Sequence, residues 1–193
     1  MLVASMAKQQ KITTFLWYHG DAEAAIEFYI SVFGNGRILE RSYWGDGGPW
    51  PKGSLLTARF ELFGQNFIAL NGGPDFRFNE AISLMVECDT QKEIDHYWKA
   101  LVKGGGEHSQ CGWLKDRFGL SWQIAPRALL RYIESDDDAL RTRVMNAMMQ
   151  MTKIDLAAIE KAAADGAPVK KTVKKAAKKP AGKAKRSPTV RRR

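Results

Sequence analysis

The sequence contains only two cysteines among its 193 residues, Cys88 and Cys111. Two cysteines are too few for the disulfide framework that stabilises many small secreted domains. Cys88 falls at the end of a predicted buried strand, and Cys111 falls in a glycine-rich loop. We therefore expect two reduced thiols in a cytoplasmic protein.

Long apolar runs are also missing. No stretch approaches the roughly 18 consecutive apolar residues that a membrane-spanning helix needs, so no membrane association is expected. Residues 1–10 lack the apolar core and cleavage site of a secretory signal, and we expect them to be a flexible N-terminus. Met6 is an alternative start of the natural chain.

Sequence patterns for common cofactors and nucleophiles are absent as well. The glycine-rich stretches 45–53 and 104–106 do not fit a Gly-x-Gly-x-x-Gly turn with an acidic residue about 20 positions later. No serine or cysteine has an evident neighbouring base. Of the three histidines, no two are spaced i, i+4 on one helix, so no metal site is predicted. We expect neither a cofactor nor a metal.

Acidic residues are missing from the end of the chain. From Ala167 onward there are twelve Lys and Arg residues and no Asp or Glu, whereas the preceding residues hold 18 basic and 21 acidic residues. The tail therefore carries +12 and the rest −3, which together give the overall charge of +9. Residues 167–193 have little apolar surface to offset the entropy of ordering, so they are expected to be disordered.

The tail resembles the basic tails of linker histones and bacterial histone-like proteins. Such charge binds phosphate backbones without sequence preference, so a nonspecific nucleic-acid contact is expected. A nuclear address, or attachment to RNA or anionic membrane, are the alternatives. The lysines expected to contact nucleic acid are Lys170, Lys171, Lys174, Lys175, Lys178 and Lys179.

An internal repeat is the strongest signal in the rest of the chain. Residues 15–29 are echoed 68 positions later by residues 83–97, with Leu16 matching Leu84 and Ile26 matching Ile94. Each copy predicts a short strand followed by an amphipathic helix ended by glycine. Asp21 is expected to cap the first helix, and Asp89 or Thr90 the second.

Further strands are predicted after each helix, so each copy has the order β-α-β-β-β. In the first copy they cover 37–44, 55–63 and 66–70, the last two forming a hairpin. In the second copy residues 107–114 make a poor strand, and 120–125 close the module. Helices are expected at 128–134, 136–151 and 152–164. The domains are therefore a paired unit at 11–127, a helical extension at 128–166 and the tail.

Paired β-α-β-β-β modules with Ile26-Glu-Phe-Tyr resemble the vicinal oxygen chelate superfamily of glyoxalases, extradiol dioxygenases and bleomycin-resistance proteins. The stretches Phe15-Leu-Trp-Tyr, Ala69-Leu-Asn-Gly-Gly-Pro, Cys111-Gly-Trp-Leu-Lys-Asp and Gly119-Leu-Ser-Trp-Gln-Ile more closely resemble its PhnB-like branch. That branch is often labelled 3-demethylubiquinone-9 3-methyltransferase. The resemblance covers about Ile12 to Pro126. It implies an α+β fold whose curved, mixed but mostly antiparallel sheet surrounds a cavity.

The resemblance also indicates where metal ligands would fall. Transferred to this sequence, the positions are Thr14, Ile82, Gln123 and one residue near Ala69 to Asn71. Thr14 and Ile82 supply neither imidazole nor carboxylate, which departs from the metal-dependent members.

Aromatic and amide side chains dominate the candidate ligand site. Gln123 shares a strand face with Ser121, and the family position favours the cavity over the outer surface for it. Asn71 is either a turn residue or an amide at the cavity mouth. The six tryptophans are numerous enough to wall a site for a planar or hydrophobic molecule, or to serve packing. The residues expected to bind ligand are Trp17, Asn71, Ser83, Trp113 and Gln123.

These features favour a metal-independent binding protein similar to bleomycin-resistance proteins. The resemblance also implies a homodimer. An enzyme of the superfamily acting on an oxygen-bearing small molecule is the alternative. A DNA-associated accessory protein, based on the tail, is a third.

The tail hypothesis predicts that removing the tail removes DNA binding. A chain ending at Gly166 should lose most of the affinity of the full chain for duplex DNA at low salt. The affinity of the full chain should fall steeply between about 50 and about 200 mM salt, since binding releases counterions. Fluorescence anisotropy with labelled DNA measures both effects. Equal binding by the two chains would contradict the hypothesis.

Overall fold

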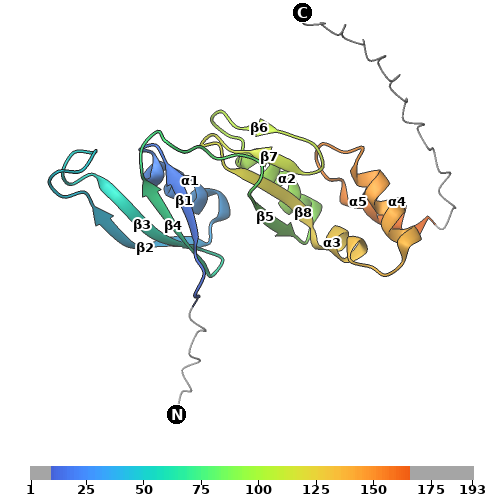
Figure 1. The fold of residues 1–193 in the computed structure, drawn as a ribbon. Helices are drawn as coiled ribbons and strands as arrows, with labels where there is room; N and C mark the ends of the chain where they lie inside the picture. Colours follow the sequence, from blue (N-terminus) through green and yellow to red (C-terminus); the bar gives the residue numbers. More distant parts are fainter. Residues whose placement is uncertain (1–9, 166–193) are drawn as a thin grey trace, which may run out of the picture.

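The computed structural model describes residues 10–165 and has an α+β architecture (Figure 1). The first module has the order β-α-β-β-β that the repeat predicts. Its elements are β1 (Thr14–Tyr18), α1 (Ala22–Phe33), β2 (Gly36–Tyr43), β3 (Leu55–Leu62) and β4 (Gln65–Asn71). The basic tail with its six lysines, and all but Gln10 of the expected flexible N-terminus, lie outside the described residues.

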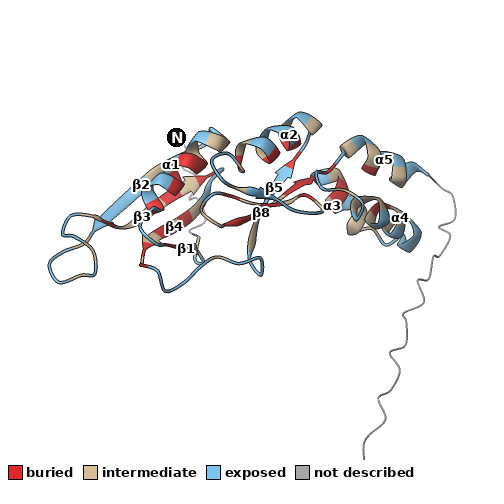
Figure 2. Ribbon diagram, turned by 90° about the horizontal axis from the view of Figure 1, so that it is seen from above, coloured by how far each residue is buried: buried red, intermediate tan, exposed pale blue. Residues whose placement is uncertain are grey.

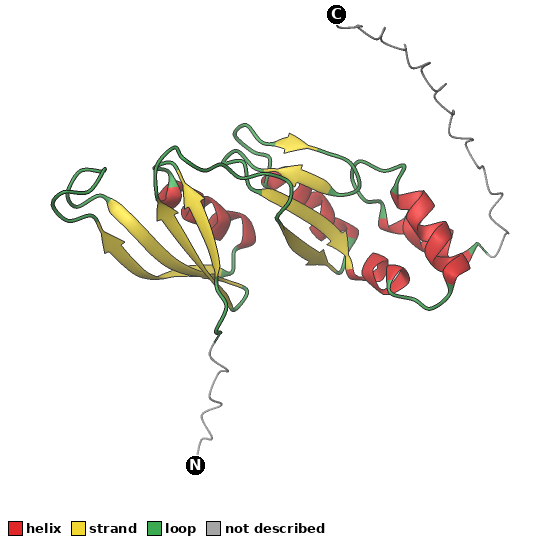
Figure 3. Ribbon diagram, viewed as in Figure 1, coloured by secondary structure: helices red, strands yellow, loops and turns green. Residues whose placement is uncertain are grey.

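The second module repeats this order with much shorter second and third strands, and three helices follow it (Figure 3). Its elements are β5 (Ser83–Cys88), α2 (Gln91–Ala100), β6 (Glu107–His108), β7 (Trp113–Lys115) and β8 (Ser121–Pro126). The expected poor strand at 107–114 is thus split into β6 and β7. The remaining helices are α3 (Arg127–Ile133), α4 (Asp138–Met148) and α5 (Leu156–Ala164).

Each module forms its own four-stranded mixed sheet, in the orders β1-β4-β3-β2 and β5-β8-β7-β6. In both sheets the first strand of the module pairs in parallel with the last, and the other pairings are antiparallel. The α+β class and the duplicated modules are confirmed, with two open sheets in place of one continuous curved sheet. Figure 2 shows α1 and α2 on the same side of the two sheets.

Matching residues of the repeat occupy matching places in the core. Ile26 in α1 and Ile94 in α2 are both fully buried against their sheets. Leu16 of β1 and Leu84 of β5 both pack into the core from the first strand of a module. The amphipathic helices therefore form because each sheet covers their apolar face, as the sequence period predicted.

The start of α1 differs from the expectation. Asp21 makes no side-chain hydrogen bond to the helix, although it occupies the N-cap position. Instead the backbone N–H of Ala22 donates to Asn71 Oδ1 at 2.9 Å. Asn71 thus accepts a hydrogen bond from a free amide of the first turn, whereas the sequence analysis expected Asp21 to do so. At α2, by contrast, Thr90 and Glu93 form a capping box.

A buried carboxylate joins the two modules. Asp116, which lies just after β7 and is 3% exposed, accepts hydrogen bonds from Tyr29 Oη of α1 and Trp122 Nε1 of β8, both at 2.8 Å. Its other oxygen accepts from the backbone N–H groups of Phe118 and Leu120. Burial raises the pKa of Asp116, while these four donors act in the opposite direction.

The C-terminal helices form a small core of their own, made of Leu129, Val144, Ile154 and Ile159. Two backbone hydrogen bonds attach this extension to the second module, from Cys111 N–H to Met151 O and from Gly112 N–H to Thr152 O, both at 2.8 Å.

No helix within residues 10–165 is both long and apolar enough to cross a membrane. Both cysteines are free thiols, and burial raises the pKa of Cys88 to about 12.

The Asp116 contacts predict that Asp116→Ala destabilises the protein strongly. The substitution leaves two buried backbone amides, an indole N–H and a tyrosine hydroxyl without their acceptor, so the free energy of unfolding should fall by about 3 kcal/mol or more. Urea denaturation measures the change. Asp46→Ala, which removes a carboxylate on an exposed loop, is the control and should have little effect. Equal effects of the two substitutions would contradict this role for Asp116.

Candidate functional site

The face of the second sheet that points away from α2 presents a row of polar side chains. Strand register places Glu107 opposite Lys115, Lys115 opposite Ser121, and Ser121 opposite Ser83. Successive strand residues alternate between faces, so Leu114 and Trp122, next to this row in sequence, are buried on the opposite side. The row therefore crosses all four strands on one face.

A second row runs beside the first on the same face. Register places Trp113 opposite Gln123 and Gln123 opposite Met85. Gln123 Nε2 donates to Ser83 Oγ at 2.8 Å, which links the two rows. Three of the five side chains predicted to bind ligand, Ser83, Trp113 and Gln123, are thus brought together.

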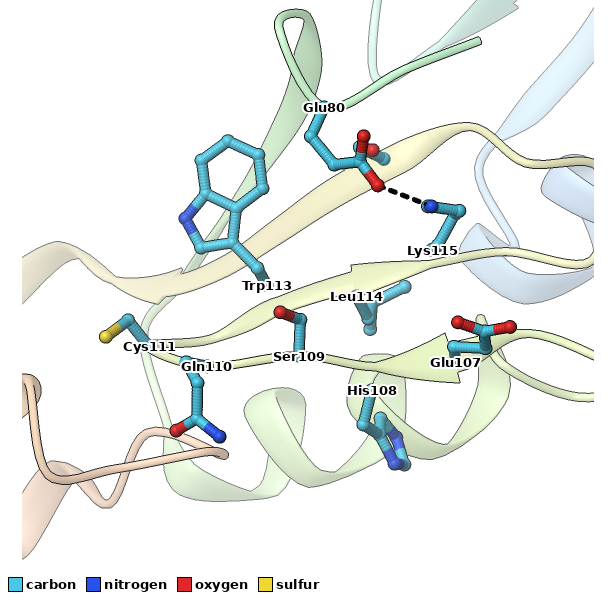
Figure 4. Close-up of a pocket in the computed structure, with 10 residues that line it drawn as sticks. Glu80, Glu107, His108, Ser109, Gln110, Cys111, Trp113, Leu114 and Lys115 are labelled. Atoms are coloured by element: carbon cyan, nitrogen blue, oxygen red, sulfur yellow. Dashed lines mark ion pairs between the residues drawn. The ribbon is translucent and has the colours of Figure 1, made fainter. Parts of the chain in front are cut away.

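A cavity of about 500 Å³ lies over part of this face, next to Trp113, Lys115 and Ser121 (Figure 4). Glu80, from the linker between the modules, reaches over the sheet and pairs with Lys115 at 2.5 Å. This hydrogen bond lowers the pKa of Glu80 and raises the pKa of Lys115, so both groups are charged at neutral pH. The cavity thus has an aromatic wall and a charged pair at its cover.

Ser121 is the least satisfied polar group of the cavity. The residue is 1% exposed, yet its hydroxyl has no hydrogen-bond partner among the described residues. A buried hydroxyl without a partner costs free energy, because water no longer solvates it. A serine hydroxyl can both donate and accept, so a molecule in the cavity can bond this one once the side chains that cover it move aside.

Trp17 belongs to the first sheet and does not line this cavity. It lies between the inward-facing Leu16 and Tyr18 of β1, and its indole N–H donates to Gly73 O at 2.9 Å. Phe76 of the linker packs edge-on against the indole. Gly72 permits this packing, since a Cβ there would lie 2.3 Å from the Trp17 ring.

Asn71 is on the helix side of the first sheet and is 7% exposed. Besides accepting from Ala22, its amide donates to Leu55 O at 3.0 Å. Both hydrogen bonds are internal, so the Asn71 side chain joins α1 to the start of β3, a role that was not among the two considered for it.

The positions transferred from metal-dependent relatives do not make a metal site. Thr14 shares its strand face with the buried Leu16, and Ile82 lies exposed before β5. On the open faces, β1 presents Phe15 and Trp17 and β5 presents Ser83, while Gln123 offers an amide. This donor set does not fit a divalent ion, which prefers imidazole and carboxylate. Within residues 10–165 no three His, Cys, Asp or Glu residues are grouped as metal ligands.

Lys115, Ser121 and Glu80 were not among the predicted site residues. Two of them could have been predicted from the alternation of strand residues. Lys115 follows Trp113 by two positions and Ser121 precedes Gln123 by two, so each shares a face with a predicted site residue. Glu80 carried no such signal, because it lies in an irregular linker whose path depends on the packing of both modules.

Comparison with known proteins places this geometry in a family. The model of the family described as 3-demethylubiquinone-9 3-methyltransferase matches residues 10–125, more than half of the chain. No match is found among curated proteins.

Solved structures agree with the family match. A PhnB protein from Bacillus cereus is 36% identical, with a TM-score of 0.56, and the match covers 61% of this chain and 99% of that one. A protein from Pseudomonas aeruginosa has the same fold at 21% identity and a TM-score of 0.51, over 61% and 98% of the two chains. The chain belongs to the family described as 3-demethylubiquinone-9 3-methyltransferase, as does the PhnB protein that it resembles.

Proposed function

We propose that this protein binds a small, planar and largely apolar molecule over the open face of its second sheet. Trp113 and Ser121 line the cavity and supply its aromatic wall and a polar anchor. Ser83 and Gln123, beside it on the same face, supply further polar groups for a ligand that extends along the sheet. A concave site with apolar walls and few polar anchors is typical of small-molecule binding. The unpartnered hydroxyl of the buried Ser121 is the observation that carries the proposal.

Binding, not a particular reaction, is the function these groups support best. Lys115 is held protonated by Glu80, so it is neither a ready nucleophile nor a base. The methyl transfer in the family description is not carried over to this chain. The free thiols suit the reducing conditions of the cytoplasm, which we infer as the compartment.

The proposal predicts measurable binding of neutral planar probes. Calorimetric titration with 2-naphthol or 2-naphthamide should show one site per chain in the native protein. Trp113→Ala should weaken that binding about tenfold, since it removes the aromatic wall. Tyr43→Ala, which removes an exposed aromatic side chain of the first sheet, should bind as the native protein does. No binding, or equal weakening by both substitutions, would reject the proposal.

We also propose that the protein is a homodimer. Among the described strands, β1 and β5 are outer strands of their sheets, so each has one edge without a partner strand. Apolar side chains are exposed near these edges, with Phe15 at 54% and Ile82 at 69% of their surface. Pairing of a second copy at these edges would cover both the backbone groups and the apolar surface.

Light scattering after size-exclusion chromatography tests the dimer. The native chain should have twice the mass of one chain, and the double substitution Phe15→Glu with Ile82→Glu should shift it to monomer by placing charge at the edges. Met149→Glu, on the C-terminal extension, is the matched control because Met149 is also an exposed apolar residue. A native monomer, or a dimer insensitive to the double substitution, would contradict the proposal.

A further inference from the structure

The polar row on the second sheet places a cation next to an unpartnered hydroxyl. Lys115 and Ser121 are direct cross-strand neighbours on antiparallel strands. Such neighbours have Cα atoms about 5 Å apart and side chains on the same face, so a single small anionic group can lie near both side chains. A carboxylate held between them would receive a charge-assisted hydrogen bond from Lys115 and a second one from the Ser121 hydroxyl.

Glu80 shows that Lys115 pairs with a carboxylate, although the Glu80 carboxylate makes no hydrogen bond to the Ser121 hydroxyl. Its carboxylate is the counter-ion of Lys115, and both Glu80 and Ser121 line the same cavity. The Glu80 side chain is 64% exposed and belongs to the irregular linker, so the ion pair is open to solvent. Exposed ion pairs contribute little to stability, so a carboxylate from solution can replace Glu80 at little cost.

Trp113 lies next to this position along β7, two residues before Lys115. Side chains at i and i+2 of a strand share a face and lie about 7 Å apart, roughly the width of a fused aromatic ring system. A planar ring over Trp113 therefore places a carboxylate substituent near Lys115. Glu107, on the other side of Lys115, is exposed at the sheet edge and opposes an anion, but it is farther from Ser121 in the row.

We propose that the ligand is a planar aromatic carboxylate, whose carboxylate displaces Glu80 from Lys115 and accepts a hydrogen bond from Ser121. This inference rests on the proposed binding function and specifies the chemical class of the ligand. Glu80 then acts as an internal competitor that occupies the carboxylate position when no ligand is bound.

Matched probes test the inference. 2-Naphthoate and 2-naphthamide have the same ring and nearly the same shape, and differ in the charge of one group. Calorimetric titration of the full chain should show that 2-naphthoate binds at least tenfold more tightly, as expected for a hydrogen bond between charged groups. Lys115→Met should remove this preference, so that 2-naphthoate binds no more tightly than 2-naphthamide.

Two further variants separate competition from a general charge effect. Glu80→Gln should tighten 2-naphthoate binding about threefold, because the competing carboxylate is removed, and Ser121→Ala should weaken it. Lys52→Met is the control for Lys115→Met, since Lys52 also forms an exposed ion pair, with Asp46, on a loop of the first module. It should leave the preference for 2-naphthoate intact.

The outcomes distinguish this inference from the function on which it rests. If 2-naphthamide binds as tightly as 2-naphthoate, or if Lys115→Met leaves the preference intact, the carboxylate inference is overturned and the proposed binding function stands. If Glu80→Gln weakens 2-naphthoate binding, the competitor role is overturned. If neither probe binds, both the inference and the proposed function are overturned.

Discussion

The contact of Asp116 with its four donors is the interaction on which the rest of the structure depends. Through Tyr29 it ties α1 of the first module to the second sheet, and through Phe118 and Leu120 it fixes the turn between β7 and β8. That turn sets the register in which Lys115 lies opposite Ser121. One buried carboxylate therefore joins the modules and aligns the two polar residues of the cavity.

The aromatic packing around this contact explains how two small sheets share one core. Tyr29 and Phe33 of α1 pack against Trp122 of the second sheet, with ring centroids 5.3 and 5.4 Å apart. Tyr18 of β1 extends the network with a hydroxyl contact of 3.1 Å to Tyr29. Large rings bury much apolar surface, while their polar ends need partners. Asp116 supplies the partner for both Tyr29 and Trp122.

The sequence contained enough information to predict the fold but not all of the site. Ile26 and Ile94 are matching positions of the repeat, and a glycine follows each helix, so the sequence predicted two modules. Both signals are local, because they depend on helical periodicity and on backbone conformation at the helix end. Period-two alternation also placed Gln123 correctly on a face with Ser121. The cap on α1 was misassigned to Asp21, because the true partner, Asn71, is 49 residues away. A hydrogen bond between distant residues leaves no periodic pattern in the sequence.

The parallel pairing of first and last strands has a consequence for how the two halves evolve. In each module the first strand pairs with the last, β1 with β4 and β5 with β8, so the linker between the modules takes no part in strand pairing. Substitutions or insertions in this linker can change which side chains cover the second sheet, while the strands of both sheets keep their registers. Glu80, the part of the ligand site that this linker supplies, can therefore vary without a change in strand pairing, whereas Trp113, Lys115 and Ser121 lie in the strands themselves.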